Sequence, residues 1–141
     1  MNRLNNKGQT LALFVAFIPF FIMIGTFVID VSYAKYNSNK LNEITKMVAS
    51  YGVKHIDEDP YKEMVDLIYQ NYDEIDNYKI DIDEENKIVN VCLDKSTKGF
   101  FGSIVGKKIY KQKSEYKGFL KDDRIIIEEV RNEKSFNNIL E

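Results

Sequence analysis

The side chains that most often carry catalysis or bind metals are few in this chain and widely separated. His55 is the one histidine and Cys92 the one cysteine of the 141 residues. A zinc site needs several Cys or His ligands at short spacing, and an intramolecular disulfide needs a second cysteine. Nucleophilic catalysis likewise needs a base and an orienting group near the nucleophile. We therefore expect no enzyme, no cofactor and no small-molecule substrate.

Two acidic clusters are the remaining candidates for chemistry, as Ca²⁺ ligands. They are Asp57-Glu58-Asp59 and Glu84-Glu85. Neither has the alternating ligand spacing and the glycine of a calcium loop, so solvated charged turns are the favoured interpretation. Cys92 alternates with Ile88 and Asn90, as a thiol within a strand does, and pairing with a second chain is its alternative role.

The strongest pattern in the sequence is the apolar run from Leu11 to Ile29, which contains no charge. Nineteen helical residues span about 28 Å, close to the hydrocarbon thickness of a bilayer. The run predicts a transmembrane helix in contact with lipid, with anchor residues spread along its length. These residues are Leu11, Phe14, Phe17, Pro19, Phe20, Ile24 and Ile29.

The charges that flank this run predict its orientation. Arg3 and Lys7 precede it and Asp30 follows it, so residues 1–10 are expected to be cytoplasmic and residues 30–141 to be exported across the cell membrane. A signal peptide cleaved near Ser32-Tyr33-Ala34 is one alternative. A buried core helix is another, but it would need a large protein around it.

A second helical pattern follows over residues 30–55 and is amphipathic. Its apolar stripe is a helix-packing seam with two interpretations, a contact with neighbouring subunits or a face covered by the chain's own globular part. Gly52 is the predicted end of this helix. The stripe consists of Ala34, Asn37, Leu41, Ile44, Val48 and Tyr51.

Residues 56–130 predict a small α+β domain, and residues 131–141 a flexible tail. Asp59 and Pro60 can begin a helix whose apolar face runs from Tyr61 to Tyr72. Period-two alternation then predicts a hairpin from Tyr78 to Asp94, a strand from Ile109 to Lys117 and a short strand from Ile125 to Val130. The fold class is thus α+β, a transmembrane helix continued by a long amphipathic helix, with a small antiparallel sheet.

The segment between the second and third predicted strands has two apolar pairs bounded by lysines. One interpretation is a loop that dips into the outer leaflet while its lysines meet anionic head groups. The other is a loop that folds its apolar side onto the core. The residues concerned are Lys98, Phe100, Phe101, Ile104, Val105 and Lys107.

Three features together resemble the TadE/TadG-like proteins of the tight-adherence (Flp) pilus machinery. They are the start Asn6-Lys7-Gly8-Gln9-Thr10-Leu11, the helix exit Phe27-Val28-Ile29-Asp30, and the strand, aromatic-glycine loop and strand that end near residue 118. The resemblance implies a pilin-like fold and a structural or assembly role as a minor pseudopilin with other pilus subunits as partners. Gly8 matches the processing point of pilin-like leaders, but Leu13 stands where they carry a glutamate, so an uncleaved anchor is expected.

Two functional hypotheses follow from the sequence. The first is a structural component of a Tad/Flp-type pilus or related secretion system, acting through helix packing and surface contacts. The second is a membrane-tethered binding module with Tyr51, Tyr61, Tyr69 and Tyr72 as its contacts, although tyrosines in such a pattern more often lie in the core. Nucleic acid is not an expected partner, because the 20 basic residues are scattered among 22 acidic ones.

Overall fold

The computed structural model describes residues 6–72, 75–99 and 109–130. Two compact units make up these residues. One unit takes the residues up to Lys35 and those from Lys98 to Tyr110, and the other takes the remainder. The elements, in chain order, are α1 (Asn6–Lys54), a short 3-10 helix η1 (Ile56–Glu58), α2 (Tyr61–Asn71), β1 (Asn77–Asp83), β2 (Ile88–Lys98), β3 (Ile109–Lys121) and β4 (Arg124–Glu129).

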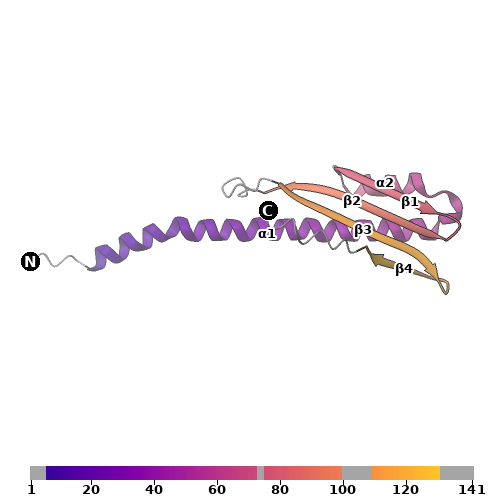
Figure 1. The fold of residues 1–141 in the computed structure, drawn as a ribbon. Helices are drawn as coiled ribbons and strands as arrows, with labels where there is room; N and C mark the ends of the chain where they lie inside the picture. The colour runs from indigo at the N-terminus through magenta and orange to yellow at the C-terminus, as the bar shows by residue number, and fades with distance from the viewer. Residues whose placement is uncertain (1–5, 73–74, 100–108, 131–141) are drawn as a thin grey trace, which may run out of the picture. The chain divides into compact units, whose positions relative to one another are not determined.

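Four strands form one antiparallel sheet in the order β1-β2-β3-β4 (Figure 1). Alternating sequences explain them, because successive side chains of a strand point to opposite faces. In β2, Val89, Val91 and Leu93 are fully buried whereas the residues between them are half-buried. The predicted α+β layout, with a long apolar N-terminal helix and a small antiparallel sheet, is confirmed.

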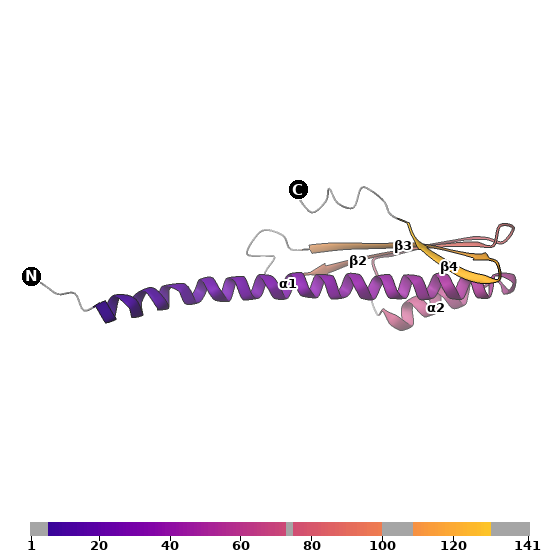
Figure 2. The same cartoon turned by 90° about the horizontal axis from the view of Figure 1, so that it is seen from below.

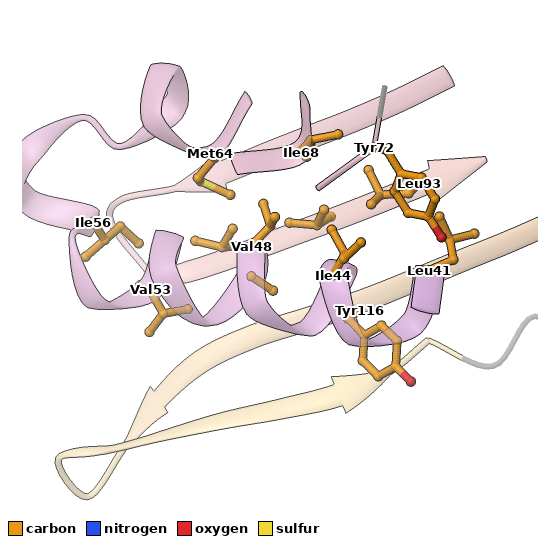
Figure 3. Close-up of a cluster of buried hydrophobic side chains, with 13 residues drawn as sticks. Leu41, Ile44, Val48, Val53, Ile56, Met64, Ile68, Tyr72, Leu93 and Tyr116 are labelled. Carbon is orange, nitrogen blue, oxygen red and sulfur yellow. The ribbon is translucent and has the colours of Figure 1, made fainter. Parts of the chain in front are cut away.

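The second half of α1 and the helix α2 pack on one face of this sheet (Figures 1 and 2). We call it the inner face. Figure 3 shows how the side chains of the helices and of β2 and β3 meet there. The buried core consists of Leu41, Ile44, Val48, Ala49, Val53, Ile56, Met64, Ile68, Tyr72, Val89, Val91, Leu93 and Tyr116.

The turn between β1 and β2 is held by a carboxylate. Asp83 accepts hydrogen bonds from the backbone N–H of Asn86 at 3.0 Å and from its side-chain amide at 2.8 Å. These bonds favour the ionised form, so they hold the pKa of Asp83 below its usual value. Lys87 follows with a positive φ of 53°. The polar residues here therefore close the hairpin, as the sequence pattern predicts.

Two predicted boundaries are wrong. Asp59 does not cap α2, because Pro60 is the N-cap residue and no side-chain cap bond forms. Asp59 instead ends η1 in the left-handed region, with φ 51°. Gly52 does not end α1, which continues to Lys54. A Cβ on Gly52 would lie 2.7 Å from Met64 Sδ, so the glycine lies at a close contact inside the helix and does not terminate it.

A second glycine lies where α1 packs against β3. A Cβ on Gly118 of β3 would lie 2.8 Å from Val53 Cγ2, 3.0 Å from Ile127 Cδ1 and 3.2 Å from the backbone oxygen of Ala49. A branched side chain and a backbone atom can move little. By contrast, the atoms that face Gly52 include the flexible end of Met64.

This difference predicts opposite outcomes for two Gly→Ala substitutions. Gly118→Ala overpacks the core and is expected to lower the free energy of unfolding by about 1–3 kcal/mol. Gly52→Ala gains about 1 kcal/mol of helix propensity that offsets the shift of Met64, so its net effect should be near zero. Denaturant titration of the full-length chain in detergent, followed by circular dichroism, measures both. Equal losses for the two variants would contradict this account of the packing.

Candidate functional site

The apolar surface of α1 is the largest candidate functional feature. From Leu11 to Ile29 the side chains are exposed around the whole helix, apart from the half-exposed Thr26. Among the large apolar side chains of this range, exposed fractions run from 42% for Ile18 to 66% for Leu11. All seven residues predicted as the membrane anchor are exposed. Soluble monomers rarely expose a continuous apolar surface of this size, so this surface needs a partner or a lipid environment.

Thr26 carries the polar side chain of this stretch and pairs it within the helix. The Thr26 hydroxyl donates to the backbone oxygen of Met23 at 2.7 Å, within its own helix. Pro19 lies inside the helix and lacks an N–H, so the backbone oxygen of Val15 loses its usual helical donor, a loss that transmembrane helices tolerate. In hydrocarbon every polar group must find a partner inside the protein, and the Thr26 hydroxyl meets that condition. One helix of the described residues is long and apolar enough to cross a membrane.

A buried carboxylate follows directly after the apolar stretch. Asp30 is 3% exposed, and a Cβ placed on Gly99 would lie 3.0 Å from its Oδ2 and 2.7 Å from the ring of Tyr110. The sequence interpretation used Asp30 only as a charge that marks the helix exit and missed its burial. A carboxylate is rarely buried without partners, and the absence of a side chain at residue 99 gives it room beside Gly99.

The predicted packing seam lies mostly within the chain's own core. Leu41, Ile44 and Val48 are buried in the cluster beneath the sheet and α2. Asn37 is 8% exposed, and its backbone oxygen accepts a hydrogen bond from Tyr72 Oη at 3.4 Å. Asn37, Leu41, Ile44 and Val48 are therefore covered by the chain's own globular part, which is the second interpretation of the seam. Ala34 and Tyr51 are half-buried.

Tyr72 joins three elements of the core. Its ring is buried at the end of α2, with Lys40 Nζ of α1 at 4.7 Å and Lys95 Nζ of β2 at 4.3 Å from the ring centroid. Burial raises the pKa of its hydroxyl, and the electrostatic effect of Tyr36 raises it further. A tyrosine that stays neutral between two ammonium groups acts as a packing residue with cation–π contacts.

The residues considered first for chemistry have other partners. His55 stacks on Tyr51, with ring centroids 4.5 Å apart, and its Nδ1 lies 3.0 Å from Glu58 Oε2. Asp57 pairs with Lys87 at 3.4 Å. Within residues 6–72, 75–99 and 109–130 no group of three His, Cys, Asp or Glu side chains could hold a metal ion.

Cys92 lies half-buried on the outer face of the sheet. Burial, followed by the charge of Asp94, raises the pKa of its thiol. The thiolate is the reactive form, so these surroundings make Cys92 a poor nucleophile.

Some predicted site residues lie outside the described part of the chain. Lys98 is exposed at the end of β2. The other five residues of the predicted membrane-surface loop, Phe100, Phe101, Ile104, Val105 and Lys107, fall in the range 100–108, and the predicted tail falls in 131–141; neither range is described. Gly8 lies in the first turns of α1 and has open space around it.

Comparisons with protein-family models, with curated proteins and with solved structures found no match to this chain.

Proposed function

We propose that this protein is a single-pass membrane protein whose globular unit lies outside the cytoplasmic membrane. The globular unit is the compact unit that begins at Tyr36 and contains the buried core. The observation that carries the proposal is the exposed apolar surface of α1 between Leu11 and Ile29. At about 1.5 Å per residue its nineteen positions match the hydrocarbon thickness of a bilayer. Arg3 and Lys7 on one side and Asp30 on the other favour a cytoplasmic N-terminus.

We further propose that the protein acts as a structural or assembly component of a Tad/Flp-type pilus or related secretion system. The sequence features that resemble TadE/TadG-like proteins cover residues 5 to about 118. One helix, α1, supplies both the apolar anchor and part of the core of the globular unit. A helix of this kind suits a protein that works by packing rather than by turnover of a substrate.

The second candidate function is a membrane-tethered binding module. Tyr61 and Tyr69 favour it, because they are 46% and 49% exposed on α2. Exposed tyrosines present apolar area together with a polar hydroxyl, a combination enriched at binding surfaces. Tyr69 also packs edge-on against Tyr78 at 6.0 Å, which holds its ring in place.

Protease accessibility in intact spheroplasts tests the membrane topology. The full-length chain with an epitope after Glu141 should stay in the membrane pellet after carbonate extraction, and added protease should remove the epitope without lysis. Recovery in the soluble fraction, or protection of the epitope, would contradict the proposal. N-terminal sequencing of the mature chain distinguishes an intact anchor from cleavage near Ala34.

Deletion of the gene in the organism that encodes it separates the two functions. A pilus component predicts loss of surface fibres, restored by the wild-type chain and by a Tyr61→Ala/Tyr69→Ala variant. A binding module predicts intact fibres and a defect that the double variant reproduces.

A further inference from the structure

Both edges of the sheet are open within the described part of the chain. The strand order β1-β2-β3-β4 leaves β1 and β4 with one neighbour each. An open edge exposes a row of backbone N–H and C=O groups that can pair with another strand. Neither proline nor lysine interrupts β4, whose sequence Arg-Ile-Ile-Ile-Glu-Glu has three consecutive β-branched residues.

The backbone groups that β4 presents at its outer edge can be assigned. Val130 N donates to Glu115 O at 2.9 Å, and Glu129 lies opposite Tyr116 in the register. In an antiparallel pair, every second residue bonds to the neighbouring strand. Residues 124, 126, 128 and 130 therefore bond to β3, and Ile125 and Ile127 present their N–H and C=O groups at the outer edge.

Chirality shows which residues of β1 present their backbone groups at its open edge. For an L-residue in a strand, the strand direction and the sheet face of its side chain together determine the edge toward which its N–H and C=O groups point. Strands β1 and β4 run in opposite directions and lie at opposite edges of this four-stranded sheet. At both edges, therefore, the residues whose side chains lie on the inner face point their N–H and C=O groups outward. In β1 these residues are Tyr78, Ile80 and Ile82, which are half-buried.

The two edges are complementary in one register. When β4 of one copy runs antiparallel to β1 of another, Ile127 lies opposite Ile80 and Ile125 opposite Ile82 on the inner face. On the outer face, opposite charges then meet twice. These pairs are Glu128 with Lys79 and Arg124 with Asp83.

We propose that β4 of one copy of this chain pairs with β1 of a second copy, edge to edge, to extend the sheet. Ile–Ile pairs and opposite charges directly across an antiparallel ladder each stabilise it. The contact joins two different surfaces, so each copy keeps one open edge and the assembly can continue beyond a dimer. This inference does not depend on the pilus function proposed above.

Disulfide trapping in membranes from cells that express the full-length chain tests the register. The background carries Cys92→Ala, because Lys79 lies opposite Cys92 in the same chain. Lys79→Cys with Glu128→Cys places two thiols across a pair that is not hydrogen-bonded, where the Cα atoms lie about 4.5 Å apart and a disulfide can form. Mild oxidation should give a ladder of dimers and larger species on a non-reducing gel.

The matched control is Lys79→Cys with Arg124→Cys in the same background. Four residues, or about 13 Å, separate position 124 from the position opposite residue 79, so we expect roughly tenfold less oligomer. Adding Arg124→Asp to the Lys79→Cys/Glu128→Cys variant sets two acids opposite each other and should lower the linked fraction roughly threefold, whereas Arg124→Lys should preserve it.

Three results would overturn the proposal. Dimers from Ile126→Cys alone would mean that β4 pairs with β4 of another copy, because Ile126 would then face its own counterpart. A ladder that forms only after removal of residues 131–141 would mean that the chain's own C-terminal segment occupies the edge. Equal linking of the test and control variants would mean random collision.

Discussion

Two lysines in the middle of the apolar stretch of α1 are expected to remove the chain from the membrane. Phe20→Lys with Ile24→Lys changes two side chains that are 51% and 45% exposed and that do not belong to the buried core. On the insertion scale a lysine at the centre of a transmembrane helix costs about 2.5–3.5 kcal/mol. Two such charges should shift most of the protein from the carbonate-resistant pellet to the soluble or degraded fraction.

The control for this experiment is a lysine at an exposed apolar position beyond the stretch. Tyr36 is 64% exposed, so Tyr36→Lys adds a charge without entering the nineteen-residue run and should leave the pellet fraction unchanged. The outcome that contradicts an anchor is equal recovery of the double variant and the wild type in the pellet. Loss of both variants from the pellet would indicate general instability.

Local patterns of the sequence are sufficient to predict most elements of this fold. Alternation from Tyr78 to Asp94 predicts the first hairpin, and β1 and β2 occupy nearly that range. The position of Pro60 predicts the start of α2, which begins at Tyr61. These signals are local, since the period of burial and the backbone limits of proline depend on neighbouring residues alone.

Features that depend on distant contacts could not be predicted in this way. Gly52 is typical of a helix end, but it lies inside α1, in close approach to Met64 and Val89. Asp59 has the right side chain for a cap, yet its backbone is used to reverse the chain after η1. In both cases tertiary packing decides between two local conformations that the same residue type permits.

The candidate site also contains residues that local patterns predict and residues whose surroundings depend on distant contacts. The unbroken apolar run predicts the anchor residues, and all seven are exposed. The stripe that includes Leu41, Ile44 and Val48 has the same pattern whether a partner or the chain itself covers it, so its burial in the core required the structure. Burial of Asp30 had no signal beyond its place next to the apolar run.

Truncation of Tyr72 is expected to give the largest loss of stability in the globular unit. Tyr72→Ala removes a ring that is 5% exposed and contacts α1, α2 and β2. Removing a buried aromatic ring costs about 3–5 kcal/mol, through lost burial and the cavity left behind. The variant also removes the aromatic partner of Lys40 and Lys95. Denaturant titration of the full-length chain in detergent should show the midpoint falling sharply.

Tyr72→Phe is the matched control, because it keeps the ring and removes only the hydroxyl. The hydrogen bond to Asn37 O is long, at 3.4 Å, so its loss should cost below about 1 kcal/mol. The cation–π contacts should survive, since they depend on the ring face. A loss for Tyr72→Phe as large as that for Tyr72→Ala would mean that the hydroxyl, rather than ring packing, holds α1 and α2 together. A loss below about 1 kcal/mol for Tyr72→Ala would mean that the ring is not part of a closed core.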